Sequence, residues 1–502
     1  MKIPRYTNNW MSIVGIFLAI NSFILIAVLF IISFTMGAGS SYLGIYIYIV
    51  LPALLVIGLI LIPAGMLIKY RRSKGKASEQ GQRWPLLDLN NKKQRKKVAI
   101  LSTVTLAFIL ISAAGSYQAY HYTESVAFCG KLCHSVMNPE YVTYLNSPHA
   151  RVKCVECHVG EGADWYVKSK ISGLYQVYSV TFHKYSRPIP TPIKSLRPAR
   201  ETCENCHWPQ KFYARQLRNQ RGFLTDSLNT DWNISMQMKV GPEYSSFGLS
   251  EGIHWHINPD VKIEYIASTN DRESIPWVRY TNLKTGKVQI FQDSENMLDK
   301  KGMDTLKAGM RTMDCMDCHN RPAHAYKSAP VYVDNALLSG SIPKELPFVK
   351  KAAMQVLKDP FASTDAAMRC IRDSMYDFYK NKYPQIFSSE KNLIDKAITG
   401  IQEEFKKNAF PEMNVNNTSY LNHIGHLESD GCFRCHSGNH KDESGQVISK
   451  DCNLCHTIVG QGTSKNFESV ALKNSLEFKH PIDIGDGWKE SNCSECHKVL
   501  YP

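Results

Sequence analysis

Fourteen of the 15 cysteines in this 502-residue chain occur in pairs, and a histidine directly follows the second cysteine of every pair. Six pairs have the spacing C-x-x-C-H, and the first pair has one more residue between its cysteines. The seven motifs are Cys129/Cys133/His134, Cys154/Cys157/His158, Cys203/Cys206/His207, Cys315/Cys318/His319, Cys432/Cys435/His436, Cys452/Cys455/His456 and Cys493/Cys496/His497.

This pattern is the attachment signal for c-type haem. Two thiols add to the two vinyl groups of the porphyrin, and the adjacent histidine reaches the iron from one face. Zinc sites and disulfide frameworks also use paired cysteines, but neither requires a histidine after every second cysteine. The sequence therefore predicts seven covalently bound haems, the first on a wider loop that must bulge to reach both vinyl groups.

A low-spin haem needs a sixth ligand on the opposite face of the iron, which is usually histidine or methionine. Ten histidines lie outside the motifs, and Met137 stands three residues after His134. Met137 is thus a candidate ligand of the first haem. The predicted histidine ligands lie close to a motif or to one of the patterns described below, and they are His149, His256, His324, His426, His440 and His480, with His254 and His423 as near alternatives.

The remaining cysteine, Cys370, falls in a stretch with helical spacing. We expect it to be a buried small side chain, because free cysteine usually behaves as a small hydrophobic residue.

Three uncharged apolar segments precede the motifs, residues 11–36, 42–68 and 98–119, and each is long enough to cross a bilayer. The segment 69–97 carries 11 Lys and Arg against two acidic residues, a net charge of +9. By the positive-inside rule, the N-terminus and this loop are cytoplasmic and the chain from about residue 121 lies outside, in the periplasm. The first segment is too long for a signal peptide and lacks a small-residue cleavage site, so we expect it to be retained.

Charge elsewhere in the chain gives no indication of nucleic-acid binding. The loop accounts for +9 of the net charge of +14, and Lys2 and Arg5 account for +2, which leaves +3 for the exported part. Export itself agrees with the motifs, since thioether attachment of haem takes place outside the cytoplasmic membrane in bacteria.

The motifs divide the exported part into groups of three, one and three, with about one haem per 55 residues. At this density the porphyrins are expected to supply much of the core. The predicted fold is a membrane-anchored multihaem cytochrome c with three transmembrane helices and a mainly α or irregular haem-packed domain. The predicted domains are a membrane domain at 1–120, a trihaem domain at 121–215, a haem-poor β-containing segment at 216–310 and a tetrahaem domain at 311–502.

Two haem-free stretches of the exported part have regular patterns. Alternation at Val261–Ser268, Trp277–Asn282 and Lys287–Phe291 predicts a small antiparallel meander. Apolar spacing at Lys344–Lys358, Ala366–Tyr379 and Lys391–Lys407 predicts helices. The C-terminal cluster is rich in turn residues and is expected to be mostly loop and short helix.

Several local patterns follow the third apolar segment. They are Met137 after the first motif, Ser147-Pro148-His149, Cys154-Val155-Glu156-Cys157-His158-Val159, the run from Trp165 through Lys168, Lys170 and Gly173 to Tyr178, and Thr202–Pro209. Together they resemble the NapC/NirT family of membrane-anchored multihaem quinol dehydrogenases. Through Cys318–His324 and Gly431–His436, the rest of the chain looks like the larger seven-haem inner-membrane cytochromes of metal-reducing bacteria, the ImcH type.

The resemblance implies oxidation of menaquinol or a similar quinol at the periplasmic face of the inner membrane. Electrons would pass to periplasmic multihaem cytochromes, as in anaerobic or extracellular electron transfer. Candidate proton acceptors are Lys168, Lys170 and His183, although lysines at a membrane face also contact lipid and His183 could instead ligate iron. Gln176 stands about where the family often has an acidic residue, and three spans stand where the family usually has one.

Two alternatives to a quinol dehydrogenase stay open at this point. One is an electron conduit that docks on another membrane oxidoreductase. The other is a terminal reductase, which needs an iron with an open coordination position. The sequence does not indicate such an iron, because ten histidines outside the motifs are available as ligands and no C-x-x-C-K motif occurs.

Overall fold

The structure is a computed structural model that describes residues 7, 9–36, 50–73, 89–132, 134–160, 162–191, 197–306 and 309–500. The chain forms two compact units, residues 1–138 and 139–502, and each is described by itself.

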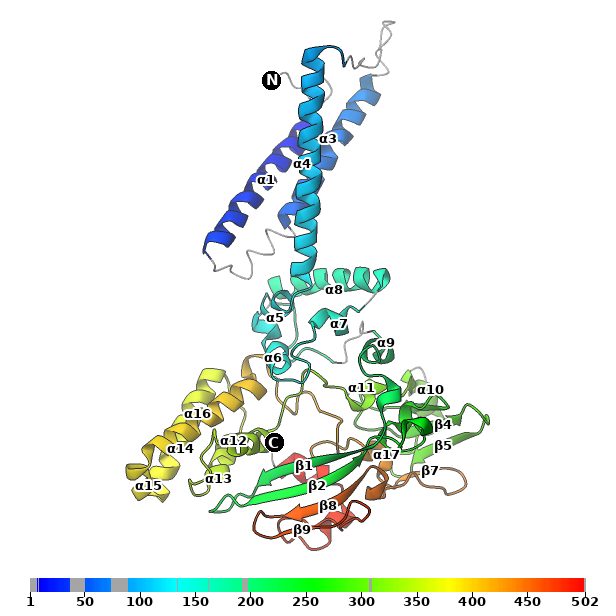
Figure 1. Cartoon of the computed structure of the whole chain (residues 1–502), viewed down its shortest axis with the longest axis vertical. Helices are drawn as coiled ribbons and strands as arrows, with labels where there is room; N and C mark the ends of the chain where they lie inside the picture. Colours follow the sequence, from blue (N-terminus) through cyan, green and yellow to red (C-terminus); the bar gives the residue numbers. More distant parts are fainter. Residues whose placement is uncertain are drawn as a thin grey trace. The chain divides into compact units, whose positions relative to one another are not determined.

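The first unit contains the long helices α1 (Trp10–Met36), α3 (Leu51–Ser73) and α4 (Lys92–Thr123), followed by the short α5 (Val126–Lys131) (Figure 1). Within the described residues, two stretches are long and apolar enough to cross a membrane, Trp10–Leu29 and Leu51–Arg72. The helix α4 covers the third predicted span. Residues 42–49 of the second predicted span and 74–88 of the basic loop lie outside the described residues.

Small residues let α1 and α3 approach closely. A Cβ atom on Gly15 would lie 2.7 Å from the carbonyl oxygen of Gly58, and the Ser12 hydroxyl donates a hydrogen bond to the Ile62 carbonyl at 2.9 Å. Glycine pairs of this kind are a common means of packing helices in a bilayer, where close backbone contact replaces the hydrophobic effect.

The second unit starts within α6 (His134–Leu145), and its first part is helical. It continues with α7 (Cys154–His158), α8 (Ala163–Thr181) and α9 (Ala199–Cys203). The other short helical elements are η3 (Pro209–Lys211), η4 (Ser245–Phe247), η5 (Ile253–Ile257), α10 (Lys300–Leu306), α11 (Cys315–Cys318), η7 (Pro411–Met413), α17 (Phe433–His436), η8 (Cys452–Leu454), α18 (Gly487–Glu490) and α19 (Cys493–Leu500).

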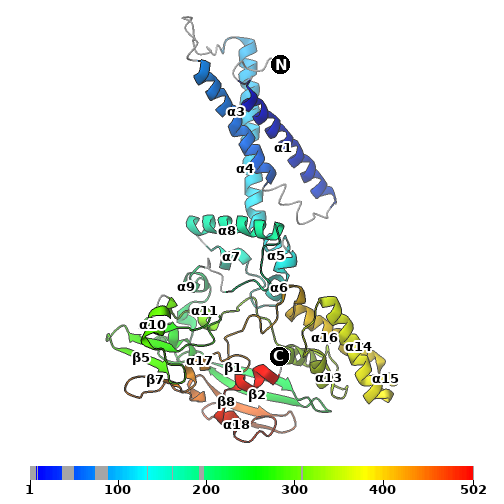
Figure 2. The same ribbon diagram turned by 180° about the vertical axis from the view of Figure 1, so that it is seen from behind.

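The second unit also contains two antiparallel sheets (Figure 1; Figure 2). The four-stranded sheet has the order β1 (Arg215–Phe223), β2 (Asp231–Lys239), β8 (His456–Gly462) and β9 (Phe467–Ser469). The five-stranded sheet has the order β6 (Arg311–Thr312), β3 (Val261–Ile266), β4 (Trp277–Asn282), β5 (Val288–Asp293) and β7 (His440–Lys441).

The four-stranded sheet is an element that the sequence analysis missed. β1 is polar on both faces and mostly exposed, so it lacks the alternation that marks a half-buried strand. β8 begins at the motif residue His456, within a segment expected to be loop and short helix. Its register with β2 joins parts of the chain more than 200 residues apart, such as Asn233 opposite Gly462.

A helical group without haem motifs lies between the fourth and fifth motifs. It contains α12 (Ala329–Leu338), α13 (Val349–Val356), α14 (Thr364–Lys382), α15 (Pro384–Ser389) and α16 (Lys391–Asn408). Its core is made of ordinary apolar side chains that are fully buried, including Val333, Ile371, Met375, Tyr379, Ile394 and Ile401. This part of the second unit therefore has a core of its own, made of apolar side chains.

The prediction of a buried Cys370 is wrong. The buried face of α14 repeats every four residues through Ala367, Ile371, Met375 and Tyr379, and Cys370 stands beside this face rather than on it. The Cys370 side chain is exposed.

Candidate haem centres

The described C-x-x-C-H motifs lie on or directly after short helical turns. Residues three apart face the same side of a helical turn, so both thiols of a motif can reach one edge of a porphyrin. The helix α11 is fixed by its own acidic residues. The Asp314 carboxylate accepts a hydrogen bond from the Met316 amide at 2.8 Å, and the Asp317 carboxylate accepts one from the Asp314 amide at 2.7 Å.

Six motif histidines each face one histidine from outside the motifs. Metal–imidazole bonds of about 2 Å, with each ring centre about 1 Å behind its nitrogen, hold the centres of two opposed ligands about 6 Å apart. The observed separations of the ring centres are His158–His324 6.2 Å, His207–His149 6.0 Å, His319–His254 6.4 Å, His436–His256 5.9 Å, His456–His426 6.2 Å and His497–His480 6.1 Å. The residues present therefore fit an iron between each pair.

Backbone hydrogen bonds orient most of the outer histidines. An Nδ1 atom that donates to a carbonyl leaves Nε2 unprotonated and able to bind a metal. Five of the six make this contact, His149 with Pro322 at 3.0 Å, His254 with Val240 at 2.9 Å, His256 with Ile253 at 3.0 Å, His324 with Glu140 at 3.0 Å and His480 with Ile482 at 2.7 Å. Burial, with a further contribution from His158, lowers the pKa of His324 to about 4, which favours its neutral, coordinating form.

One expected ligand, His440, is engaged elsewhere. It is almost fully buried, and its Nε2 atom lies 2.7 Å from the carbonyl oxygen of Ile275. His254, which sequence proximity ranked lower, faces His319 instead. His423, the other alternative, pairs with Glu273 through Nε2 at 3.1 Å. The spacing His254-Trp255-His256 was the signal that could have shown two ligands in one segment.

The described motifs are neighbours in space in the order of the sequence. A hydrogen bond between the Cys203 and Cys315 thiols raises the pKa of Cys203 and lowers that of Cys315. Burial raises the pKa of Cys318 to about 12, and the nearby Cys432 thiol adds to the effect. Successive motifs come near each other, because burial and a thiol of the neighbouring motif together raise the pKa of Cys157 (with Cys206), Cys203 (with Cys315), Cys318 (with Cys432), Cys455 (with Cys432) and Cys493 (with Cys452). Haems on these cysteines would form a row.

Cys496 of the seventh motif is exposed, like Cys157, Cys206, Cys318, Cys432 and Cys452 among the described motif cysteines. Its side chain is exposed on α19. The buried side of this helix is that of Ser494, whose hydroxyl donates a hydrogen bond to the Asp430 carboxylate at 2.5 Å. Because residues two apart on a helix point about 200° apart, the contact that buries Ser494 turns Cys496 toward solvent. Attachment of haem through Cys496 stays a prediction.

The first motif is only partly described. Cys129 lies on α5, whereas Cys133 and the side chain of His134 lie outside the described residues. Met137 is half-buried on α6.

The candidate quinol residues lie on or just after α8. Lys168 is exposed and its Nζ atom stands 4.7 Å from the centre of the Trp165 ring. Lys170 is half-buried on the same helix. His183 is exposed two residues beyond the end of α8, with its ring centre 6.4 Å from that of Tyr185.

An apolar stripe runs along α8 between these lysines. The side chains of Ile171, Leu174, Tyr175, Tyr178 and Phe182 are between 43% and 67% exposed. At about 3.6 residues per turn they share one face, and Lys168 and Lys170 fall on its two borders.

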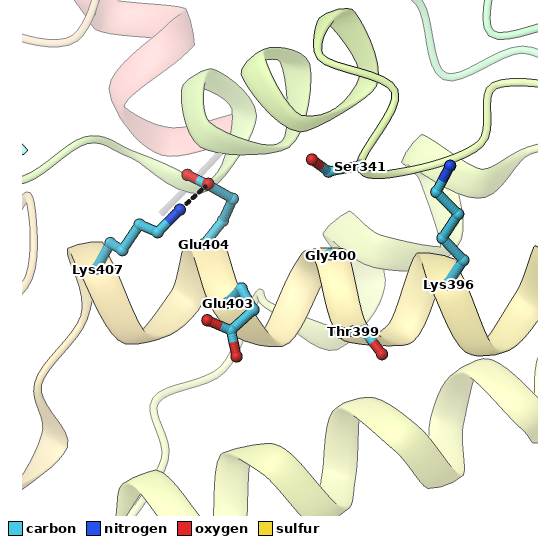
Figure 3. A pocket seen from close by; sticks show the side chains of 7 residues that line it. All are labelled: Ser341, Lys396, Thr399, Gly400, Glu403, Glu404 and Lys407. Atoms are coloured by element: carbon cyan, nitrogen blue, oxygen red, sulfur yellow. Dashed lines mark hydrogen bonds and ion pairs between the residues drawn. The ribbon is translucent and has the colours of Figure 1, made fainter.

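Two cavities in the second unit are lined by described residues. The cavity in Figure 3, about 300 Å³, lies against α16 and is lined by charged residues, with an ion pair of 2.7 Å between Lys407 and Glu404. No cysteine or histidine is among the described residues that line it. A hollow of about 410 Å³ is lined in part by His480 and Trp488 and thus offers space beside a paired histidine.

Comparison with known proteins places the chain among c-type cytochromes. Residues 91–189 match the NapC/NirT cytochrome c family, N-terminal region. The chain is 40% identical to the cytochrome c-type protein ImcH of Geobacter sulfurreducens over 496 residues, 99% of this chain and 96% of that protein.

The chain belongs to the ImcH-type family of c-type cytochromes. Members of this family, with their NapC/NirT region, are membrane multihaem electron-transfer proteins with covalently bound haem. Similarity to the cytochrome c-type protein NrfH of Wolinella succinogenes is more local, 35% identity over 78 residues, which are 15% of this chain and 44% of that protein. No solved structure matches this ImcH-type chain.

Proposed function

We propose that this ImcH-type cytochrome carries seven haems, oxidises menaquinol or a similar quinol at the periplasmic face of the inner membrane, and passes the electrons to periplasmic multihaem cytochromes. The observation that carries the proposal is the set of six opposed histidine pairs, arranged in a row of neighbouring motifs.

The proposed axial ligands follow from these pairs. Each motif histidine binds one face of its iron, and His149, His254, His256, His324, His426 and His480 bind the opposite faces. This set has His254 in place of His440, whose Nε2 atom is engaged by a backbone carbonyl. Met137 is the proposed sixth ligand of the first haem. When bound, each haem supplies one-electron redox chemistry, so a two-electron donor such as quinol needs at least two of them close together.

The quinol site is proposed beside α8. A lipid-soluble quinol reaches the protein from the bilayer, and the exposed stripe of α8 is an apolar surface bordered by Lys168 and Lys170. These lysines, or His183, would accept the two protons that quinol releases. Two of the apolar helices support a membrane anchor. We further propose that α4 is a third span and that the N-terminus is cytoplasmic, from the basic loop.

Electrons would enter at the first motifs and leave through the C-terminal group. The first three motifs follow α4 directly in the sequence, whereas the last three lie more than 200 residues further on. The donor is dissolved in the membrane and the acceptor in water, so this order matches each end of the row to its partner. Docking of an acceptor cytochrome is expected to be steered by charge and weakened by salt.

The test is reduction by quinol of the purified full-length protein in nanodiscs. A menaquinol analogue should reduce the haems of the wild type, and Lys168→Gln or Lys170→Gln should slow this reduction while reduction by dithionite stays unchanged. Lys351→Gln, at an exposed lysine of α13, is the matched control and should reduce at the wild-type rate. Wild-type rates in both α8 variants would place the quinol site elsewhere.

The second candidate is an electron conduit that takes electrons from another membrane oxidoreductase. It predicts that the purified wild type is not reduced by quinol at all, although dithionite reduces it fully. The same experiment therefore separates the two functions.

A further inference from the structure

Two of the paired histidines belong to one turn of the chain. His254 and His256 are separated by a single residue on η5, yet their rings face histidines of different motifs, His319 and His436. The two rings meet their partners at different angles, 5° for His254 with His319 and 85° for His256 with His436.

The residue between them anchors the turn. The Trp255 ring stacks on Tyr280 of β4, with ring centres 5.6 Å apart and an angle of 24°. Trp255 also packs against the buried cluster of the five-stranded sheet, which includes Ile263 and Tyr265. Backbone carbonyls of Val240 and Ile253 hold the Nδ1 atoms of His254 and His256, so both Nε2 atoms are directed away from the turn.

The motifs Cys315–His319 and Cys432–His436 also contact each other directly, through Arg434 and Asp317. Arg434 and Asp317 occupy the same place in their motifs, directly before the second cysteine. The Arg434 guanidinium donates to the carbonyl of Asp317 at 2.7 Å and to that of Arg272 at 3.0 Å. Both Arg434 and Asp317 are buried. The Asp317 carboxylate in turn accepts hydrogen bonds from the Tyr265 hydroxyl at 2.5 Å and from Arg272 at 2.9 Å.

We propose that the turn Ile253–Ile257 is a shared arm that ligates two haems, those of Cys315–His319 and Cys432–His436, and makes them one rigid unit. This proposal rests on the haem ligation proposed above. The arm fixes the two irons on the side opposite the motifs, and Arg434 fixes the motifs to each other. Trp255 is the positioning residue, because it holds both histidines without touching either iron.

The place of this unit in the row gives it a function. The fourth motif neighbours the third through Cys315 and Cys203, and the fifth neighbours the sixth through Cys432 and Cys455. Electrons that enter at the first three haems and leave by the last two would therefore cross this pair. A fixed distance and orientation between the two haems would keep the rate of electron transfer between them constant while other parts of the protein move.

The test uses the full-length protein with His254→Ala, His256→Ala and the double variant. Intact mass should show all haems still attached, because the cysteines are unchanged. Electron paramagnetic resonance and resonance Raman spectra should show one high-spin haem in each single variant and two in the double variant. His440→Asn is the matched control at a buried histidine and should leave every haem low-spin. A double variant with no more high-spin haem than either single variant would overturn the shared arm.

Two further variants protect the test against simple loss of folding. His254→Met should keep its haem low-spin but with the spectrum of methionine ligation and a higher potential. Trp255→Ala should give high-spin character at two haems, and Trp255→Phe should restore both. If Trp255→Ala affects one haem or none, the turn does not position both ligands.

Reduction by quinol separates this inference from the proposed function. In the double variant, quinol should still reduce the haems of the first three motifs quickly, and the C-terminal haems should lose their rapid reduction. Rapid reduction of every haem would overturn the obligatory role of the pair. A wild type that quinol does not reduce would instead overturn the proposed function, while the spectra would still decide whether the arm is shared.

Discussion

The ring nitrogens of individual histidines decide which residues are available to iron. His149 and His440 differ in this respect. Pro322 engages Nδ1 of His149 and leaves Nε2 free, whereas Ile275 engages Nε2 of His440. A proposed ligand and a structural histidine thus differ in which ring nitrogen the backbone carbonyl engages, Nδ1 in His149 and Nε2 in His440.

The first prediction concerns this pair of residues. His149→Ala should convert one low-spin haem, that of Cys203–His207, to high spin, because His149 faces His207. His440→Ala should leave all haems low-spin but lower the stability, since it leaves the Ile275 carbonyl without its buried partner, a loss of about 1–3 kcal/mol. Electron paramagnetic resonance and chemical denaturation measure the two effects. Unchanged spectra of His149→Ala would remove the ligand assignment.

The second prediction concerns the pH dependence of stability. Burial alone would raise the pKa of Glu273, but the hydrogen bond and charge of His423 and the Asp430 amide outweigh it and hold this pKa below the ordinary carboxyl value. The ionised carboxylate therefore stabilises the fold above its unfolded pKa, and this stability is lost as the pH falls from about 5 through the folded pKa.

Glu273→Gln should therefore be less stable than the wild type at pH 7, and the difference should shrink on acidification. Denaturant unfolding at several pH values measures it. A gap that stays constant with pH would show that the carboxylate charge does not matter.

At the scale of elements, α8 differs from the other long helices of the second unit. The apolar faces of α14 and α16 are buried in the core of the helical group, whereas the apolar stripe of α8 is exposed. Lysines on both borders and aromatic side chains within the stripe are typical of a helix that lies in a membrane interface. This placement would give quinol direct access from the bilayer.

The third prediction follows from this exposed stripe. In nanodiscs that contain a photoactivatable phospholipid, labelling should occur at Leu174, Tyr175 and Tyr178, and not at the exposed residues of α14. The spans α1 and α3 serve as positive controls. Labelled spans with an unlabelled α8 would contradict the interfacial placement and favour a protein partner on the stripe.

At the scale of the whole molecule, the number of haems and the sidedness of the chain decide what it can connect. Seven haems would form a path from a membrane-bound donor to an aqueous acceptor. The motifs and the basic loop must then lie on opposite sides of the membrane.

The fourth prediction is the haem count. The intact mass after denaturation should exceed that of the 56.9 kDa chain by seven haem groups. A Cys133→Ser variant should retain the other six and show whether the wider first motif is occupied. An excess of six haems in the wild type would mean that Cys129 and Cys133 form no site.

The fifth prediction is the topology. Reporter fusions at Lys76 and at the C-terminus should report opposite compartments, the first cytoplasmic and the second periplasmic, because a +9 loop stays inside. A fusion at residue 40, between the first two spans, should report the periplasm. Equal results at Lys76 and the C-terminus would mean that one span has been miscounted.

The sequence by itself determined the chemistry of attachment and the anchoring of the chain. A thioether site needs two thiols and a histidine within five residues, and a span needs only a run of apolar residues, so both are local properties. The helices at 366–379 and 391–407 were also predictable, because their apolar period is local. The same local view placed Cys370 in a core that it does not reach.

The tertiary structure decided which histidine faces which motif. A sixth ligand can come from any distance along the chain, and sequence proximity favoured His440 over His254. The partners of His149 and His158 are His207 and His324, which lie 58 and 166 residues further along. The four-stranded sheet was missed for a related reason, since β2 pairs with β8 across more than 200 residues and β1 carries no alternation. Contacts of this kind depend on how distant segments pack, so they cannot be predicted from a local sequence pattern.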